Sequence, residues 1–277
     1  MVNSVYTVVL SIAGSDSGGG AGIQGDIKTI SALGCYAATA ITAITAQNTM
    51  GVTAIHAIPV EIVKAQVLAV IDDLKPAAIK IGMVYSADLA STLVSILKTY
   101  PDIPIIFDPV MVATSGSKLI QEDTIDVLKN ELLPLTRMIT PNLDEASILA
   151  EMDIRNVDDM KVAAKIINQY RGFAVLIKGG HLQGKDLYDI YLDQHGVIHQ
   201  FHSELISTNN THGTGCGLSS AIASQIALGE SLIDSVYKAK SYIHKALLEG
   251  KDVKTGAGNG PLNHFYNPEK LYKKQNF

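Results

Sequence analysis

With 277 residues, 47% of them hydrophobic and 18% charged, the chain is long enough to bury a large core. Its formal net charge of −5, with Lys and Arg scattered along the sequence, argues against nucleic acid as a partner. No apolar run approaches the ~20 residues of a membrane span, so a membrane protein is not expected either. The two cysteines, Cys35 and Cys216, are far apart and are expected to be reduced thiols in a cytoplasmic protein.

Apolar, β-rich runs alternate with amphipathic stretches along the whole chain. The expected strands are residues 6–12, 37–46, 52–58, 78–81, 103–107, 138–139 and 174–177. The expected helices are residues 23–33, 59–74, 87–98, 122–132, 143–151, 157–170, 217–228 and 232–249. Continuous apolar strands between helices predict a mostly parallel sheet covered on both faces.

Residues 186–192 and 197–201 are expected to form a small hairpin at one edge of this sheet, because they are joined by a Gly-containing turn. The chain has no internal repeat, low-complexity linker or break in composition. Residues 1–277 are therefore expected to form a single domain, with ligands bound beyond the carboxyl ends of the parallel strands.

A glycine-rich loop follows the first expected strand, and Gly20, Gly22 and Gly25 match the dinucleotide-binding pattern G-x-G-x-x-G. That pattern also needs an acidic residue about 20 positions later to hold a ribose, but no Asp or Glu stands between Asp26 and Glu61. Neither Gly-Lys pair is followed by Ser or Thr, so the phosphate-binding P-loop pattern fails too. A dinucleotide-dependent oxidoreductase is kept only as an alternative.

Residues 211–220 read THGTGCGLSS and lead into an expected helix. Gly213, Thr214, Gly215 and Cys216 therefore lie at a helix N-terminus, where unpaired backbone N–H groups and the helix dipole attract anions. The same helix end is expected to lower the pKa of the Cys216 thiol. Taken alone, the segment fits equally well an anion cradle beside a reactive thiol, or a turn before a helix whose cysteine faces the core.

Seven motifs follow one another from the first strand to the last helices. They are DSGGGAGIQ at 16–24, TAQNT at 45–49, KIGM at 80–83, DPVM at 108–111, TPNLDE at 140–145, KGGH at 178–181 and NTHGTGC at 210–216. Together they resemble the hydroxymethylpyrimidine/phosphomethylpyrimidine kinases of the ribokinase-like superfamily, and the likeness extends through GNGPLNH at 258–264. The resemblance implies a three-layer α/β/α sandwich, a homodimer, ATP with Mg²⁺, and two successive phosphorylations of a pyrimidine for thiamine biosynthesis.

The resemblance also suggests which residues carry the chemistry. Cys216 stands where most ribokinase-like enzymes have an aspartate base, and it is expected to take the proton of the substrate's hydroxymethyl group. The N–H groups of Gly213, Thr214 and Gly215 are expected to cradle the transferred phosphoryl group. The other reading of Cys216, a structural core cysteine, is less favoured within the complete motif.

Several polar residues follow expected strands and are assigned to the ATP–Mg²⁺ end of the site. Asp108 and Glu145 are expected near Mg²⁺, which needs only one or two carboxylates when waters and phosphates complete its shell. Asn142 is expected beside the phosphates, although it also fits a helix cap after Pro141. The cofactor-binding set is completed by Lys178, which follows a wholly apolar strand, and by Lys240 on a later helix.

Gln47 is the residue expected to recognise the substrate. A carboxamide can donate to the ring nitrogen of a 4-aminopyrimidine and accept from its amino group. Gly14, Ala21 and Met83 are expected to line the ring. Pyridoxal lacks this donor and acceptor pair, so Gln47 favours the pyrimidine as substrate. A pyridoxal kinase of the same superfamily remains the first alternative, and a non-catalytic pyrimidine-binding relative is the second.

Two positions depart from the kinase pattern, and one cluster resembles a metal site. Gly217 stands where these kinases usually have Thr, which is expected to loosen the anion cradle, and Gly25 stands where Ala is common, with little expected effect. His195, His199 and His202 have spacing that zinc could use, but the residues between them favour a hairpin, so no zinc site is expected.

Overall fold

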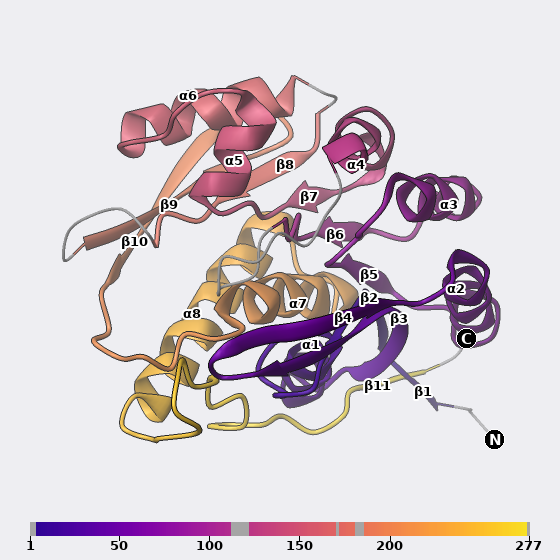
Figure 1. The fold of residues 1–277 in the computed structure, drawn as a ribbon, viewed down its shortest axis with the longest axis horizontal. Coiled ribbons are helices and arrows are strands. Elements are labelled where there is room, and N and C mark those ends of the chain that lie inside the picture. The colour runs from indigo at the N-terminus through magenta and orange to yellow at the C-terminus, as the bar shows by residue number, and fades with distance from the viewer. Residues whose placement is uncertain (1–3, 112–121, 170–171, 181–185, 276–277) are drawn as a thin grey trace.

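The computed structural model describes residues 4–111, 122–169, 172–180 and 186–275. Nine strands form one twisted sheet in the order β10-β9-β8-β7-β6-β5-β2-β3-β4 (Figure 1). Neighbouring strands from β8 to β3 are parallel, whereas β4 at one edge and β9 and β10 at the other are antiparallel. The strands of this sheet are β2 (Val8–Asp16), β3 (Tyr36–Asn48), β4 (Gly51–Ala57), β5 (Ala78–Ile81), β6 (Ile105–Phe107), β7 (Met138–Ile139), β8 (Ala174–Ile177), β9 (Asp186–Leu192) and β10 (Ile198–Glu204).

Helices cover both faces of the sheet and give the three-layer α/β/α sandwich that the sequence predicts (Figure 1). One face carries α1 (Gly22–Ala32), α7 (Thr214–Ala227) and α8 (Leu232–Gly250). The other carries α2 (Val60–Leu74), α3 (Ala87–Leu97), α4 (Glu122–Val127), α5 (Leu143–Ala150) and α6 (Val157–Asn168). Every expected element is present within a few residues, and the β9–β10 hairpin is confirmed at the sheet edge.

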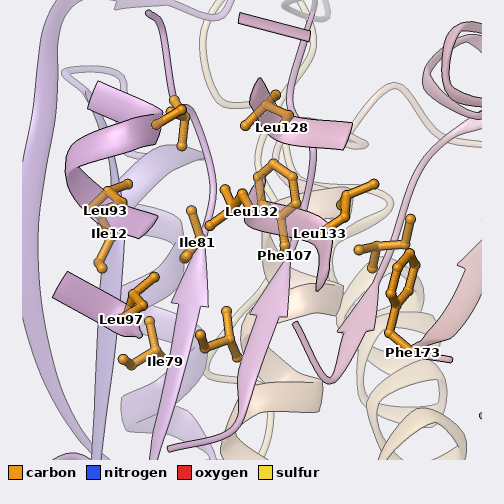
Figure 2. Packing of buried hydrophobic residues seen from close by; sticks show 14 of the residues in the cluster. Ile12, Ile79, Ile81, Leu93, Leu97, Phe107, Leu128, Leu132, Leu133 and Phe173 are labelled. Carbon is orange, nitrogen blue, oxygen red and sulfur yellow. The ribbon is translucent and has the colours of Figure 1, made fainter. Parts of the chain in front are cut away.

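The larger core lies between the sheet and the α2–α6 layer. Figure 2 shows Ile12, Ile79 and Ile81 of the strands on the side of Leu93 in α3, whereas the Phe107 ring lies among leucines of the segment 128–133. The side chains of Ile12, Ile79, Ile81, Leu93 and Phe107 are at most 1% exposed. Burying an aliphatic or aromatic side chain of this size stabilises a fold by roughly 1.5–3 kcal/mol, so this layer holds the strand ends firmly in place.

Two parts of the chain differ from the sequence prediction. The expected helix over residues 122–132 continues as α-helix only to Val127, and a π-helical turn, Leu128–Leu132, follows it before Pro134. The terminal strands β1 (Ser4–Tyr6) and β11 (Lys273–Gln275) were not anticipated; they pair antiparallel in a separate sheet. Tyr170, at the end of the expected helix 157–170, and His181 of the KGGH motif lie outside the described residues.

Among the described residues, no helix is both long enough and apolar enough to cross a membrane.

A buried histidine is expected to make stability depend on pH. The His264 side chain is 4% exposed, its Nδ1 lies 3.1 Å from Thr29 Oγ1, and burial lowers its pKa from 6.5 to about 4. The unfolded chain therefore binds the proton more tightly, so stability is full above about pH 6.5 and falls as the pH decreases toward 4. The loss is expected to reach about 3 kcal/mol in urea unfolding, and H264Q should flatten this part of the profile. A substitution of the exposed His56, H56Q, is the control; an equal flattening there would contradict the assignment.

Candidate functional site

A cavity of about 720 Å³ opens at the carboxyl ends of the parallel strands, where the N-terminus of α7 meets the glycine-rich loop after β2. Strand β2 lies between β3 and β5, so the strand order reverses at β2. The connections that leave the sheet on the two sides of this point run in opposite directions, and a crevice forms between them. The cavity wall includes every residue that the sequence assigned to the site: Gly14, Ala21, Gln47, Met83, Asp108, Asn142, Glu145, Lys178, Gly213, Thr214, Gly215, Cys216 and Lys240. The topology thus brings together residues as far apart in the sequence as Gly14 and Lys240.

The N-terminus of α7 has a backbone shape that only glycine provides. Gly213 caps the helix with a φ of +83°, and a Cβ there would collide with the carbonyl oxygen of Gly20. At Gly215, a Cβ would come to 3.3 Å from Lys178 Nζ. The two glycines allow the helix end to contact the glycine-rich loop and the Lys178 ammonium together, which concentrates backbone N–H groups and positive charge at one point of the cavity.

The Cys216 thiol sits in the first turn of α7, partly buried in the cavity wall. Burial raises its pKa to about 11; the Lys80 ammonium and the Gly22 N–H favour the thiolate, whereas the Asp26 and Asp108 carboxylates oppose it. The expectation of a lowered thiol pKa is therefore wrong. Desolvation of the thiolate outweighs the attraction of the helix end.

A buried ion pair lies on the α1–α7 side of the sheet, and sequence reasoning assigned it no role. Lys80 of β5 and Asp26 of α1 are both 0% exposed, with Nζ 2.8 and 3.0 Å from the two carboxylate oxygens. Ser11 and Ser220 also donate to this carboxylate, at 2.6 and 2.7 Å. Although burial opposes the charge, Asp26 holds the pKa of Lys80 above its ordinary value, so Lys80 adds a permanent cation to the cavity wall. The sequence does contain a signal for this buried ion pair, because Lys80 stands within the otherwise apolar strand AIKI.

Asp108 and Lys178 form a second ion pair across the ends of β6 and β8. Lys178 Nζ lies 2.8 Å from Asp108 Oδ1, and Thr140 Oγ1 donates to the same oxygen at 3.1 Å. Burial favours the neutral acid, but Lys178 and then Lys80 hold the pKa of Asp108 below its usual range. The pair is therefore ionised and lies next to the α7 N-terminus.

Asn142 and Glu145 form a reciprocal cap at the start of α5. The Asn142 side chain accepts from the Glu145 N–H at 2.9 Å, and the Glu145 carboxylate accepts from the Asn142 N–H at 2.7 Å. The helix cap expected of Asn142 is confirmed, and Asn142 also lines the cavity; its place beside the phosphates stays a prediction. Burial raises the pKa of Glu145 to about 7, against the opposing effect of Lys178, so a nearby cation would readily ionise it.

Gln47 lies near the end of β3, at an irregularity in the pairing with β4. Its Oε1 accepts from Thr45 Oγ1 at 3.1 Å, and its Nε2 lies 3.4 Å from His212 Nε2. His212 Nε2 is also 2.8 Å from Asp16 Oδ2, and an ionised carboxylate can only accept, so the histidine donates its hydrogen there. The Gln47 amide hydrogens consequently remain available to a ligand in the cavity.

Asp16 organises the glycine-rich loop, a role that sequence reasoning missed. Its carboxylate accepts from the N–H groups of Gly18, Gly20 and Ala21 at 2.8, 3.1 and 2.8 Å. Burial opposes its ionisation, but the hydrogen bond from His212 and those from the loop hold the pKa of Asp16 below its ordinary value. A Cβ at Gly20 would collide with the His212 ring, so the GGG run lets the loop close on this histidine.

The three residues expected around a substrate ring meet on the same wall. A Cβ at Gly14 would come to 3.1 Å from Met83 Sδ, so the glycine leaves room for the thioether beside it. Met83 is 7% exposed, and Ala21 directly precedes α1. These small or polarisable apolar groups line the same cavity as the Gln47 amide, which suits a flat heteroaromatic ring.

Lys240 of α8 lines the cavity and is already paired. Its Nζ forms an ion pair with Asp189 Oδ2, and the other carboxylate oxygen accepts from the Gly179 N–H at 2.8 Å. This link ties α8 to the backbone just after Lys178. The neighbouring wall is apolar and includes Leu205, Ile206, Ile243 and Leu247.

Both departures from the kinase pattern can now be placed. A Cβ at Gly217 would come to 3.0 Å from Ile243 Cδ1 and 3.4 Å from Leu262 Cδ1, so a side chain there points into the α7–α8 packing. The expected loosening of the cradle through a missing hydroxyl is therefore wrong. A Cβ at Gly25 would come to 2.8 Å from Gly20 O, which makes this glycine more important than expected, because the loop would have to shift for an alanine.

Two of the three hairpin histidines make contacts within the hairpin. His202 Nε2 lies 2.7 Å from Asp186 Oδ1 across the β9–β10 ladder, and His199 contacts the Tyr191 ring. In the part of the chain that the structure describes, no cluster of three or more His, Cys, Asp or Glu side chains has metal-binding geometry.

The chain resembles known proteins over nearly its whole length. Residues 16–263 match the model of a family described as phosphomethylpyrimidine kinase. A hydroxymethylpyrimidine/phosphomethylpyrimidine kinase of Rhizobium meliloti (strain 1021) is 46% identical over 260 residues, which cover 94% of this chain and 97% of that protein.

Two solved structures extend the similarity to the fold. A phosphomethylpyrimidine kinase from Clostridium difficile 630 superposes with a TM-score of 0.77 at 42% identity, covering 87% of this chain and 99% of that one. An ADP complex of Bacillus subtilis pyridoxal kinase superposes with a TM-score of 0.85 at 34% identity, covering 94% of this chain and 97% of that one. These matches include a relative for each of the two kinase activities that the sequence leaves open.

Proposed function

Because the chain belongs to the phosphomethylpyrimidine kinase family, we propose that it transfers phosphate from ATP to 4-amino-5-hydroxymethyl-2-methylpyrimidine, and then to the monophosphate, for thiamine biosynthesis. One observation carries the proposal. A single cavity holds an amide suited to an aminopyrimidine, Gln47, together with a phosphate-binding helix end and a thiol, at Gly213–Cys216. Family membership also makes the chain a kinase, so the oxidoreductase and non-catalytic alternatives are wrong.

We assign the proton transfer to Cys216. In the first step the hydroxymethyl oxygen forms a bond to the γ-phosphorus as the bond from that phosphorus to the leaving oxygen of ADP breaks, and the hydroxyl proton passes to the thiolate. The N–H groups of Gly213, Thr214 and Gly215 surround the transferred group, and Lys178 offsets its negative charge. Lys80 stabilises the thiolate before the proton arrives.

The protein offers Mg²⁺ two carboxylate ligands, so phosphates and water would have to supply most of its coordination shell. Asp108 and Glu145 are two buried carboxylates on one wall, and the Glu145 pKa of about 7 means that a cation would draw it into the ionised form. When bound, Mg²⁺ neutralises phosphate charge. We propose that these two residues hold it, directly or through water, with Asn142, Lys178 and Lys240 serving the nucleotide.

Pyridoxal is the competing substrate, because the chain is 34% identical to a pyridoxal kinase over most of its length. The aminopyrimidine is favoured, since Gln47 presents the matching donor and acceptor. A product assay with ATP should show the monophosphate and then the diphosphate of hydroxymethylpyrimidine, with kcat/KM at least tenfold above that for pyridoxal, a difference of about 1.4 kcal/mol. A higher value for pyridoxal would overturn the assignment, and loss of turnover without added Mg²⁺ would support the metal.

We also propose that the chain is a single domain acting as a cytoplasmic homodimer. The sheet edge formed by β3 and β4 exposes Ile44, Met50 and Ile55, whose side chains are 48%, 68% and 44% exposed. A second copy of the chain would cover these side chains. Cys35 and Cys216 are free thiols, as a reducing compartment would keep them.

A further inference from the structure

The GNGPLNH motif near the C-terminus has no part in the proposed chemistry, and residues 256–260 do not line the cavity. Residues 256–260 contact two segments that adjoin cavity-lining residues. One is the β3–β4 turn, two residues beyond Gln47; the other is the segment leading to the Gly213–Cys216 cradle. In Figure 1 the tip of the long β3–β4 hairpin reaches the gold loop after α8. We call residues 256–260 the brace.

At the hairpin, the brace holds Thr49 by three hydrogen bonds. Thr49 Oγ1 accepts from the N–H groups of Ala257 and Gly258 at 3.2 and 3.1 Å, and Thr49 O accepts from the Asn259 N–H at 3.0 Å. A Cβ at Gly258 would collide with the Thr49 carbonyl oxygen, so the two backbones are in direct contact. Gly256, with a φ of +77°, has no room for a Cβ beside the Thr49 side chain either.

At its other end, the brace holds the segment that leads into α7. The Gly260 carbonyl accepts from the His212 N–H at 3.0 Å, and a Cβ at Gly260 would collide with the Asn210 side chain. Asn210 Nδ2 in turn donates to the Gly250 and Val253 carbonyls at 2.7 and 2.6 Å, which ties this segment to the end of α8. His212 is the residue immediately before the Gly213 cap.

These contacts link the pyrimidine-recognising amide to the phosphate-binding helix end through a path outside the cavity. We propose that the brace sets the distance between Gln47 and the Gly213–Cys216 cradle, and that Thr49 is a positioning residue for the pyrimidine. The inference rests on the proposed function, because it takes Gln47 as the group that holds the substrate. Ser17 and Thr45 still hold Gln47 when the brace is loosened, so its amide is displaced but not released, and pyrimidine affinity falls while ATP affinity does not.

The test is T49V, which keeps the branched shape but removes the acceptor of two hydrogen bonds. The KM for hydroxymethylpyrimidine, and its Kd by calorimetry, should rise roughly tenfold, equivalent to about 1.4 kcal/mol, with less than a twofold change in the KM for ATP. T49S keeps the oxygen and should stay within about twofold of the wild type. T53V is the matched control, since Thr53 donates within the same hairpin, to Ala46 O at 3.0 Å, without touching the brace.

Amide hydrogen exchange of residues 256–260, measured without ligands, should become faster in T49V and not in T53V. Unchanged pyrimidine affinity in T49V, an equal rise in the KM for ATP, or the same effects in T53V would overturn the inference. If the wild type failed to phosphorylate the pyrimidine, the proposed function would fall. The Kd and the exchange measurement would still decide whether the brace positions the hairpin.

Discussion

Replacing Gln47 with Leu is expected to weaken pyrimidine recognition by roughly 30- to 1,000-fold in kcat/KM, a loss of about 2–4 kcal/mol. Leucine fills a similar volume but offers neither a donor to the ring nitrogen nor an acceptor for the amino group. The ring would then lie against Met83 with its polar edge unpaired in the cavity. Steady-state kinetics with hydroxymethylpyrimidine as the varied substrate measures the loss.

The affinity for ATP should change less than twofold in Q47L, because the ATP-side residues Asn142, Lys178 and Lys240 make none of the hydrogen bonds described for Gln47. Q200L, at an exposed glutamine on β10, controls for the general effect of adding a leucine. An unchanged pyrimidine affinity in Q47L would remove Gln47 from the site and leave the kinase activity itself unaffected.

The sequence predicts the architecture well because the signals for it are local. Buried parallel strands are short apolar runs, such as Ala174–Ile177, and the residue after each run must come to the same edge of the sheet. That rule is enough to bring Asp108, Asn142 and Lys178 together before any coordinates are known. The β1–β11 pair could not be predicted in this way, since two three-residue strands at opposite chain ends carry no periodic pattern.

Interactions between residues that are far apart in the chain could not be predicted from the sequence. Lys80 and Asp26 are 54 positions apart, and nothing local indicates that the two charges neutralise each other inside the core. The role of Asp16 requires that the loop fold back on its own carboxylate and that His212 arrive from almost 200 residues away. The sequence did place Lys80, Asp16 and His212 in motifs, but it did not indicate what each side chain contacts.

The thiol pKa shows how a sound local argument can give the wrong sign. A helix end is expected to favour the Cys216 thiolate, but such an effect is confined to the first turn and is worth about 1 kcal/mol. Burial acts on the same sulfur and is opposed only in part by Lys80. Desolvation therefore decides the direction, and it depends on packing around α7 that no sequence pattern encodes.

Replacing Cys216 with Ala is expected to reduce kcat by roughly 10²- to 10⁴-fold while the fold and ATP binding persist, since general-base help is typically worth that much. C216D should recover part of the activity, because a carboxylate can accept the same proton, although it adds charge beside Asp108. C35A, at the other thiol, should behave like the wild type, because Cys35 is buried against α7, its Sγ 3.8 Å from Ser224 O, and does not line the cavity.

The pH dependence of kcat distinguishes the contribution of the Cys216 thiolate from that of the other groups around the phosphate. With a thiol pKa of about 11, only a small fraction is ionised at pH 7, and this fraction grows about tenfold per pH unit until the pH approaches the pKa. The wild-type kcat should therefore rise from pH 7 to about 9 without a plateau, whereas C216D, whose carboxylate is already ionised, should show no such rise. Iodoacetamide should inactivate the wild type faster at higher pH, with ATP and the pyrimidine protecting. A C216A enzyme with near-normal turnover would show that the N–H groups of α7, Lys178 and the metal suffice for the transfer, because the substrate hydroxyl would then lose its proton to water or phosphate.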